Sequence, residues 1–102
     1  QKILLVGVIS NVSETLEKEL KIVLKSLSSF KSIQVFLVES DSKDDTVRVL
    51  KKIQSYDPNF TYLSKGNLSA KLPNRIERIA FCRNVYVDFI RNNYKKYLLD
   101  KN

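Results

Sequence analysis

An apolar stretch of this sequence ends abruptly in a cluster of carboxylates and hydroxyls. Residues 33–38 are rich in β-branched and aromatic side chains, and residues 39–46 read Glu-Ser-Asp-Ser-Lys-Asp-Asp-Thr. A continuous apolar run of this length is typical of a strand covered on both faces. Glu39 and Asp41 are then expected just past the carboxyl end of a strand, where open α/β sheets bind ligands. These two carboxylates are therefore candidate ligand-binding groups.

The same acidic cluster also suits the start of a helix. Ser42 followed by Asp45 resembles an N-cap with an acidic third position. Asp44 adds negative charge beside the amides of a first helical turn, which favour it. Capping alone would account for these residues, so ligand binding and helix capping both remain open.

Apolar runs and helical patterns alternate along the chain. Strands are predicted over residues 3–9, 33–38 and 60–64. Helices are predicted after an Asn11/Glu14 capping pair, over about 43–55, and from Arg75 to about Tyr94 after an Asn74/Glu77 capping pair. This β-α-β-α-β order predicts an α/β fold, a three-layer Rossmann-like parallel sheet with right-handed crossovers. We expect the first strand in the middle, with helices on both faces.

Arg83 occupies an unusual position in the third predicted helix. Residues placed at 100° intervals give a very broad apolar arc, and Arg83 falls inside it. An arginine there must reach solvent or find an anion, because burying it unpaired is unfavourable. A structural ion pair with Glu39 or Asp41 and binding of a ligand anion are both consistent with this position.

Composition excludes several classes of site. Histidine is absent, which disfavours a hydrolase triad and a zinc centre. The single cysteine, Cys82, allows no internal disulfide, and its apolar helical surroundings predict a buried core thiol. No glycine-rich G-x-G-x-x-G follows the first strand, so a dinucleotide-dependent oxidoreductase is disfavoured. Without a membrane-spanning run or a signal-peptide pattern, we expect a soluble, cytoplasmic chain.

The net charge of +7 indicates an anionic partner. A diphosphate or an anionic lipid surface would suit it, so peripheral membrane association is consistent with the sequence. The alternative is a non-catalytic basic α/β module that binds RNA or another anionic partner. Much of the basic excess follows Leu68, in Lys71, Arg75, Arg78, Arg83, Arg91, Lys95, Lys96 and Lys101.

Residues 39–46 resemble the acidic D-D-G-S-x-D-x-T loop of inverting GT-A glycosyltransferases, the family-2-like group that uses nucleotide-sugars. Here Glu39 replaces the first Asp, Ser40 the second and Asp41 the Gly. Residues 78–84 are similar to the G-x-x-x-A-R-N helix start of the same group. The longer stretch 75–84 looks closest to a capsule and surface-glycan mannosyltransferase-like subset. Ser10 and Asn11 occupy the place of the family's P-x-Y-N, with only the Asn retained.

This resemblance implies an enzyme that transfers a sugar from a nucleoside diphosphate sugar to a glycan or lipid-linked acceptor hydroxyl, with inversion and with Mg²⁺ or Mn²⁺. Surface glycan synthesis is the implied setting, and nucleic acid is not favoured as a partner. The nucleotide-sugar-binding residues would be Ser10 and Asn11 beside the nucleoside, Glu39 and Asp41 facing the base or ribose, Arg78 near the nucleotide, and Arg83.

The metal-binding D-x-D of that group is missing from the expected place. Asp100 and Asn102 could form a degenerate version, although Asn is a poorer Mg²⁺ ligand than a carboxylate. No acceptor-binding half and no candidate catalytic base are recognisable, so no catalytic residue is assigned. We therefore expect residues 1–102 to form a single nucleotide-sugar-binding domain, part of a longer GT-A catalytic domain and inactive by itself.

Overall fold

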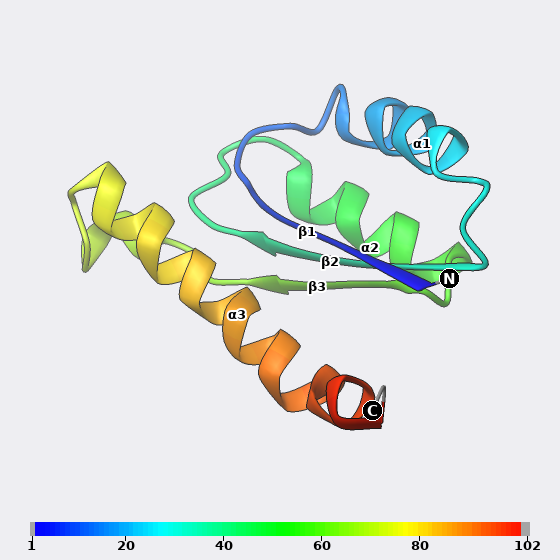
Figure 1. Cartoon of the computed structure of the whole chain (residues 1–102). Coiled ribbons are helices and arrows are strands. Elements are labelled where there is room, and N and C mark those ends of the chain that lie inside the picture. The colour runs from blue at the N-terminus through cyan, green and yellow to red at the C-terminus, as the bar shows by residue number, and fades with distance from the viewer. Residues whose placement is uncertain (1, 101–102) are drawn as a thin grey trace.

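The computed structural model describes the backbone of residues 2–100 and the side chains of residues 2–92. Strands and helices alternate along the chain (Figure 1). The elements are β1 (Lys2–Ile9), α1 (Leu16–Ser26), β2 (Ser32–Glu39), α2 (Thr46–Tyr56), β3 (Phe60–Ser64), the 3₁₀ turn η1 (Leu68–Ala70) and α3 (Arg75–Asp100). The predicted β-α-β-α-β order is confirmed. Among the described residues, no helix has the length and apolarity needed to span a membrane.

The three strands form one parallel sheet in the order β1-β2-β3. Glu39, the last residue of β2, pairs with Ile9 on one side and Ser64 on the other. The prediction that the first strand lies in the middle is wrong, because β2 has a neighbour on each edge. Burial agrees with this order: residues 35–39 of β2 are fully buried, whereas residues 3–9 of β1 are only partly buried.

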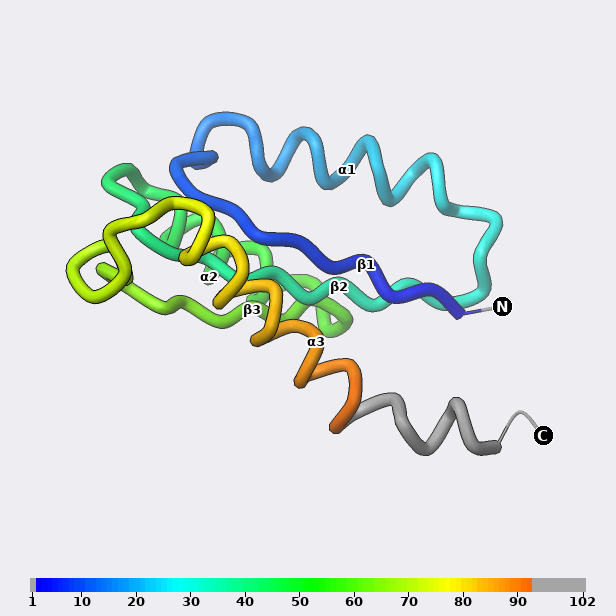
Figure 2. Tube along the Cα trace, turned by 60° about the vertical axis from the view of Figure 1, so that its left-hand side comes forward, coloured from blue at the N-terminus to red at the C-terminus, as the bar shows by residue number. Residues whose placement is uncertain are grey.

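Helices cover both faces of the sheet, as predicted (Figure 2). Because side chains alternate along a strand, Val35 and Leu37 face α1 and α2, whereas Phe36 and Val38 face α3. The Phe36 ring stacks on that of Phe89 with 3.9 Å between centroids. The helical side chains that complete the two cores are Leu16, Leu20, Leu50 and Ile53 on one face, and Cys82, Val85, Tyr86 and Phe89 on the other.

Two of the predicted helix starts are wrong. Helix α1 begins at Leu16, and Asn11 has a left-handed backbone with φ of 54° instead of capping it. Helix α2 begins at Thr46 instead of Lys43, and the side chain of its N-cap residue, Asp45, makes no capping hydrogen bond. The Asn74 cap of α3 is confirmed, because Asn74 Oδ1 accepts hydrogen bonds from the first-turn amides.

Candidate functional site

Two grooves open at the carboxyl edge of the sheet. The first, the β1 groove, has a volume of about 400 Å³ and is lined by Val8, Ile9, Ser10, Val12, Ser40, Asp41, Arg75, Arg78 and Ile79. The second, the β3 groove, has a volume of about 360 Å³ and is lined by Glu39, Asp41, Ser42, Lys43, Val47, Ser64, Gly66, Asn67 and Ser69. Asp41 lines both, so it lies between them. Parallel strands bring their carboxyl ends to one edge, which is why these loops meet here.

Glu39 is a buried carboxylate that connects the loop after β2 to the end of β3. It is the last residue of β2, whereas the sequence predicted it just past the end of the strand. Only 1% of its surface is exposed. Oε2 accepts a hydrogen bond from the Ser42 amide at 3.0 Å, and Oε1 accepts one from the Ser64 hydroxyl. A carboxylate with both oxygens engaged in this way fixes the course of the loop, which accounts for its burial.

Asp41 is held in a left-handed conformation, with φ of 58°, by contacts with the loop after β3. Its amide donates to the Gly66 carbonyl, and its Oδ1 accepts from the Ser69 amide, both at 2.8 Å. Oδ2 is buried and has no hydrogen-bond donor within the described part of the chain. Burial by itself raises the pKa of Asp41, but hydrogen bonds from Ser69 and Ser40 and the nearby Arg78 charge outweigh it and hold the pKa below its ordinary value.

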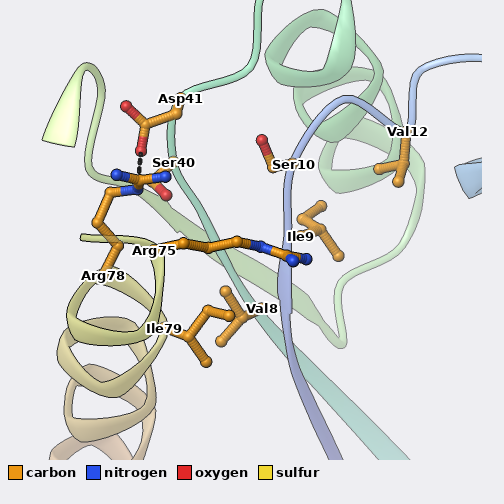
Figure 3. Close-up of a pocket in the computed structure, with 9 residues that line it drawn as sticks. All are labelled: Val8, Ile9, Ser10, Val12, Ser40, Asp41, Arg75, Arg78 and Ile79. Atoms are coloured by element: carbon orange, nitrogen blue, oxygen red, sulfur yellow. Dashed lines mark ion pairs between the residues drawn. The ribbon is translucent and has the colours of Figure 1, made fainter. Parts of the chain in front are cut away.

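Arg78 pairs with Asp41 and anchors the loop that precedes α3. Its Nε lies 3.7 Å from Asp41 Oδ2, a contact shown by the dashed line in Figure 3. Its Nη1 donates to the carbonyls of Leu72, at 2.9 Å, and Pro73, at 2.7 Å. Arg78 therefore already has two hydrogen-bond acceptors and one ion-pair partner within the protein, although sequence analysis placed it beside a nucleotide.

Hydrogen bonds across more than thirty residues of sequence join the loop after β1 to the loop after β2. The Asn11 amide donates to the Ser42 hydroxyl at 3.0 Å, and Asn11 Oδ1 accepts from the Lys43 amide at 2.7 Å. The left-handed backbone of Asn11 is therefore part of a loop-to-loop contact. Ser10, its exposed neighbour, lines the β1 groove.

Thr46 and Asp44 continue this loop-to-loop contact. The fully buried Thr46 hydroxyl accepts from the Val12 amide at 2.9 Å and donates to Asp44 Oδ1. Asp44 Oδ1 also accepts from the Thr46 amide at 3.0 Å, while Oδ2 accepts from the amide and hydroxyl of Ser13. Asp44 therefore accepts a hydrogen bond from the first amide of α2. The predicted capping pair of Ser42 and Asp45 is wrong, because α2 begins only at Thr46 and the Asp45 side chain makes no capping hydrogen bond.

Asp44 should make the protein sensitive to strong acid. The Thr46 hydroxyl and the Ser13 groups lower its pKa from 3.8 to about 2. Since the pKa is depressed in the folded state, the stabilisation is complete above about pH 4 and is lost as the pH falls through 2. Unfolding midpoints measured between pH 6 and pH 2 should therefore fall less steeply for Asp44→Asn than for the unmodified protein. Parallel pH profiles would contradict this assignment, and Asp45→Asn, whose side chain makes no capping bond, is the matched control.

Arg83 lies outside both grooves. Its side chain is exposed. Of the two alternatives left open for it, the ion pair with Glu39 or Asp41 is not formed among the described residues, because Asp41 pairs with Arg78 and Glu39 accepts from Ser42 and Ser64. Helix α3 contacts the sheet through a narrower stripe than the sequence suggested. Cys82, Val85 and Phe89 face the sheet at helical spacing, and Arg83 is rotated about 100° away from Cys82.

Sequence analysis overlooked Arg75 as a site residue. It is the first residue of α3, its side chain is exposed, and it lines the β1 groove. The spacing of three residues to Arg78 could have indicated this position, because residues three apart share one face of a helix. No sequence signal marked Ser69, whose amide reaches Asp41 only through the tertiary fold.

The described side chains do not fit a divalent metal ion. No group of three or more carboxylate, thiol or imidazole side chains comes together among them. Both oxygens of Glu39 are engaged, and the unbonded oxygen of Asp41 faces a guanidinium group. Helix α3 continues to Asp100, but the Asp100 side chain and Asn102 lie outside the described residues. We therefore derive no step that involves a metal.

The fold and the position of the grooves define a Rossmann-like α/β domain with a binding edge at the carboxyl ends of parallel strands. Over residues 8–90 the chain matches the family model described as Glycosyl transferase family 2. The match extends from the end of β1 into α3 and covers most of the chain, so the chain belongs to glycosyl transferase family 2. No curated protein and no solved structure matched the chain in the corresponding searches. Membership supports a glycosyltransferase role.

Proposed function

We propose that this chain is the nucleotide-sugar-binding portion of a glycosyltransferase, and that the nucleoside diphosphate of the donor occupies the β1 groove. The observation that carries the proposal is the lining of this groove in a family-2 domain. Apolar side chains of β1 and α3 stand beside two guanidinium groups and one carboxylate. Such a surface suits a ligand that combines a nucleobase or ribose with phosphates.

The candidate residues then divide by role. Ser10 and Asp41 line the β1 groove and would meet the ligand directly. Asn11 and Glu39 hold the surrounding loops and would act through them. Arg78 fixes the Asp41 side of the groove. Arg83 borders neither groove, and we assign it no contact with the ligand.

Transfer of the sugar would require groups beyond this domain. We propose that residues 1–102 belong to a longer GT-A catalytic domain, which would supply the ligands for Mg²⁺ or Mn²⁺ and the carboxylate that activates an acceptor hydroxyl. The acceptor would be a glycan or a lipid-linked sugar in surface glycan synthesis, as in the capsule mannosyltransferase-like subset. The basic excess after Leu68 would favour contact with an anionic membrane surface.

Nucleotide titration of the full-length protein tests this proposal. UDP or GDP should shift the amide resonances of Ser10, Asp41 and Arg75, because these residues line the groove. Amides of Ile22 and Lys25, on exposed positions of α1, should not move. Shifts confined to Lys95, Lys96 and Lys101, or tighter binding of random RNA than of either nucleotide, would contradict the proposal in favour of a basic RNA-binding module.

A further inference from the structure

Two arginines lie three residues apart at the start of α3 and differ in their partners. Arg78 donates to two backbone carbonyls and faces the Asp41 carboxylate, and only 21% of its side chain is exposed. Arg75 is exposed, and it forms no ion pair or hydrogen bond with any side chain of the described region. The two residues carry the same charge, but only Arg75 keeps its guanidinium donors available to a ligand.

The exposed Arg75 side chain extends along the β1 groove. Figure 3 shows it reaching from α3 in the direction of β1, and Arg75 and Ile9 both line the groove. Val8 and Ile79 form an apolar surface along the same groove. A guanidinium is more weakly hydrated than an ammonium group and offers a planar fork of donors, so it can lie along an apolar wall and still bind an anion.

The charge balance of the β1 groove also depends on Arg75. Asp41 is the one carboxylate among the described residues that line it, and its free oxygen already faces Arg78. Arg75 is therefore left as an uncompensated positive charge. It also stands at the amino end of α3, where the helix dipole adds positive potential. Glu77 lies in the same turn but forms no ion pair with Arg75 among the described residues.

We propose that Arg75 binds the phosphates of the ligand in the β1 groove, and that Arg78 is a positioning residue that holds the loop and Asp41 in place. This inference rests on the proposed function, because it assigns a contact to the same nucleotide. It predicts that Arg75 discriminates between a nucleoside and its diphosphate. The apolar wall would contact both ligands equally, whereas the guanidinium would contact only the phosphates.

Binding measurements on the full-length protein test this division of roles. The ligands are a nucleoside, its diphosphate and inorganic pyrophosphate, and the variants are Arg75→Gln and Arg75→Lys. Arg75→Gln should weaken binding of the diphosphate by about tenfold or more and leave the affinity for the nucleoside unchanged. Arg75→Lys should recover part of the loss, because it keeps the charge but not the planar fork. Arg91→Gln, at an exposed position of the same helix outside the two grooves, is the control and should bind all three ligands as tightly as the unmodified protein does.

The outcomes separate the inference from the proposed function. Suppose that the diphosphate binds to the unmodified protein. If Arg75→Gln leaves the affinity for the diphosphate unchanged, or weakens binding of the nucleoside and of the diphosphate by the same factor, the role proposed for Arg75 is wrong and the nucleotide site stands. If no nucleoside or nucleotide binds but pyrophosphate binds in an Arg75-dependent manner, the anion contact stands and the nucleotide site is wrong. If none of the three ligands binds to the unmodified protein, both are wrong.

Discussion

Replacing Glu39 by alanine is expected to lower the free energy of unfolding by about 3 kcal/mol. The carboxylate is buried and accepts hydrogen bonds from the Ser42 amide and the Ser64 hydroxyl. Its removal leaves two partly buried donors, the Ser42 amide and the Ser64 hydroxyl, without their acceptor, and it creates a cavity in place of the buried side chain. A lost acceptor costs about 1–3 kcal/mol, and the cavity adds to this loss. Denaturant unfolding of the full-length protein, with the slope compared between variants, measures the change.

Glu39→Gln separates the hydrogen bonds from the negative charge. The glutamine keeps one carbonyl oxygen as an acceptor, and the Ser64 hydroxyl can rotate to accept from its amide group. We expect a loss of about 1 kcal/mol, well below that of alanine. Ser64→Ala removes a single hydrogen bond to the carboxylate, so it should lower the free energy of unfolding by a similar amount. A loss below about 1 kcal/mol for Glu39→Ala would show that Glu39 does not hold the loop.

The strands could be predicted from the sequence, but their order in the sheet could not. Residues 60–64 were predicted as a strand with the bounds that β3 has. The runs at 3–9 and 33–38 are both apolar throughout, and each therefore suits a strand covered on two faces. Which of them is central depends on which edges are paired, and that pairing is not a local property of either run. β2 is central because both β1 and β3 pair with it.

The position of the candidate site followed from the sequence better than the roles of its residues. A carboxylate cluster after a buried strand located the edge at which Glu39 and Asp41 lie. The partners of Asn11 are more than thirty residues away, so no short-range capping rule could identify them. Arg83 was placed in the apolar arc of the third helix, and this placement failed for a geometric reason: the arc was drawn too broadly and included a residue that faces solvent.

Replacing Arg78 by leucine is expected to destabilise the protein by about 2 kcal/mol. The change removes the cation beside the buried Asp41 oxygen and the donors to the Leu72 and Pro73 carbonyls. Breaking a fully buried ion pair typically costs 3–5 kcal/mol, and the smaller value here allows for solvent screening at side chains that are 21% and 17% exposed. Arg83→Leu, at an exposed position of the same helix, should change stability by less than about 0.5 kcal/mol.

Much of the stability lost in Arg78→Leu should come from the Asp41 carboxylate, which is left without a cation beside its buried oxygen. Adding Asp41→Asn to Arg78→Leu removes the uncompensated charge while keeping an oxygen that can accept from the Ser69 amide, so the double variant should recover part of the stability. The Arg78 charge helps to keep the pKa of Asp41 below its ordinary value of 3.8. The contribution of the charged pair is therefore present above that pH and is lost as the pH falls through the lower pKa of the folded state. The difference between the unmodified protein and Arg78→Leu should narrow over the same range. Two results would contradict this role of the ion pair: stability losses of the two substitutions that are strictly additive, or a stability difference between the unmodified protein and Arg78→Leu that stays constant down to pH 2. Either would mean that Arg78 stabilises the protein only through the Leu72 and Pro73 carbonyls, and that its ion pair with Asp41, the residue between the two grooves, contributes nothing.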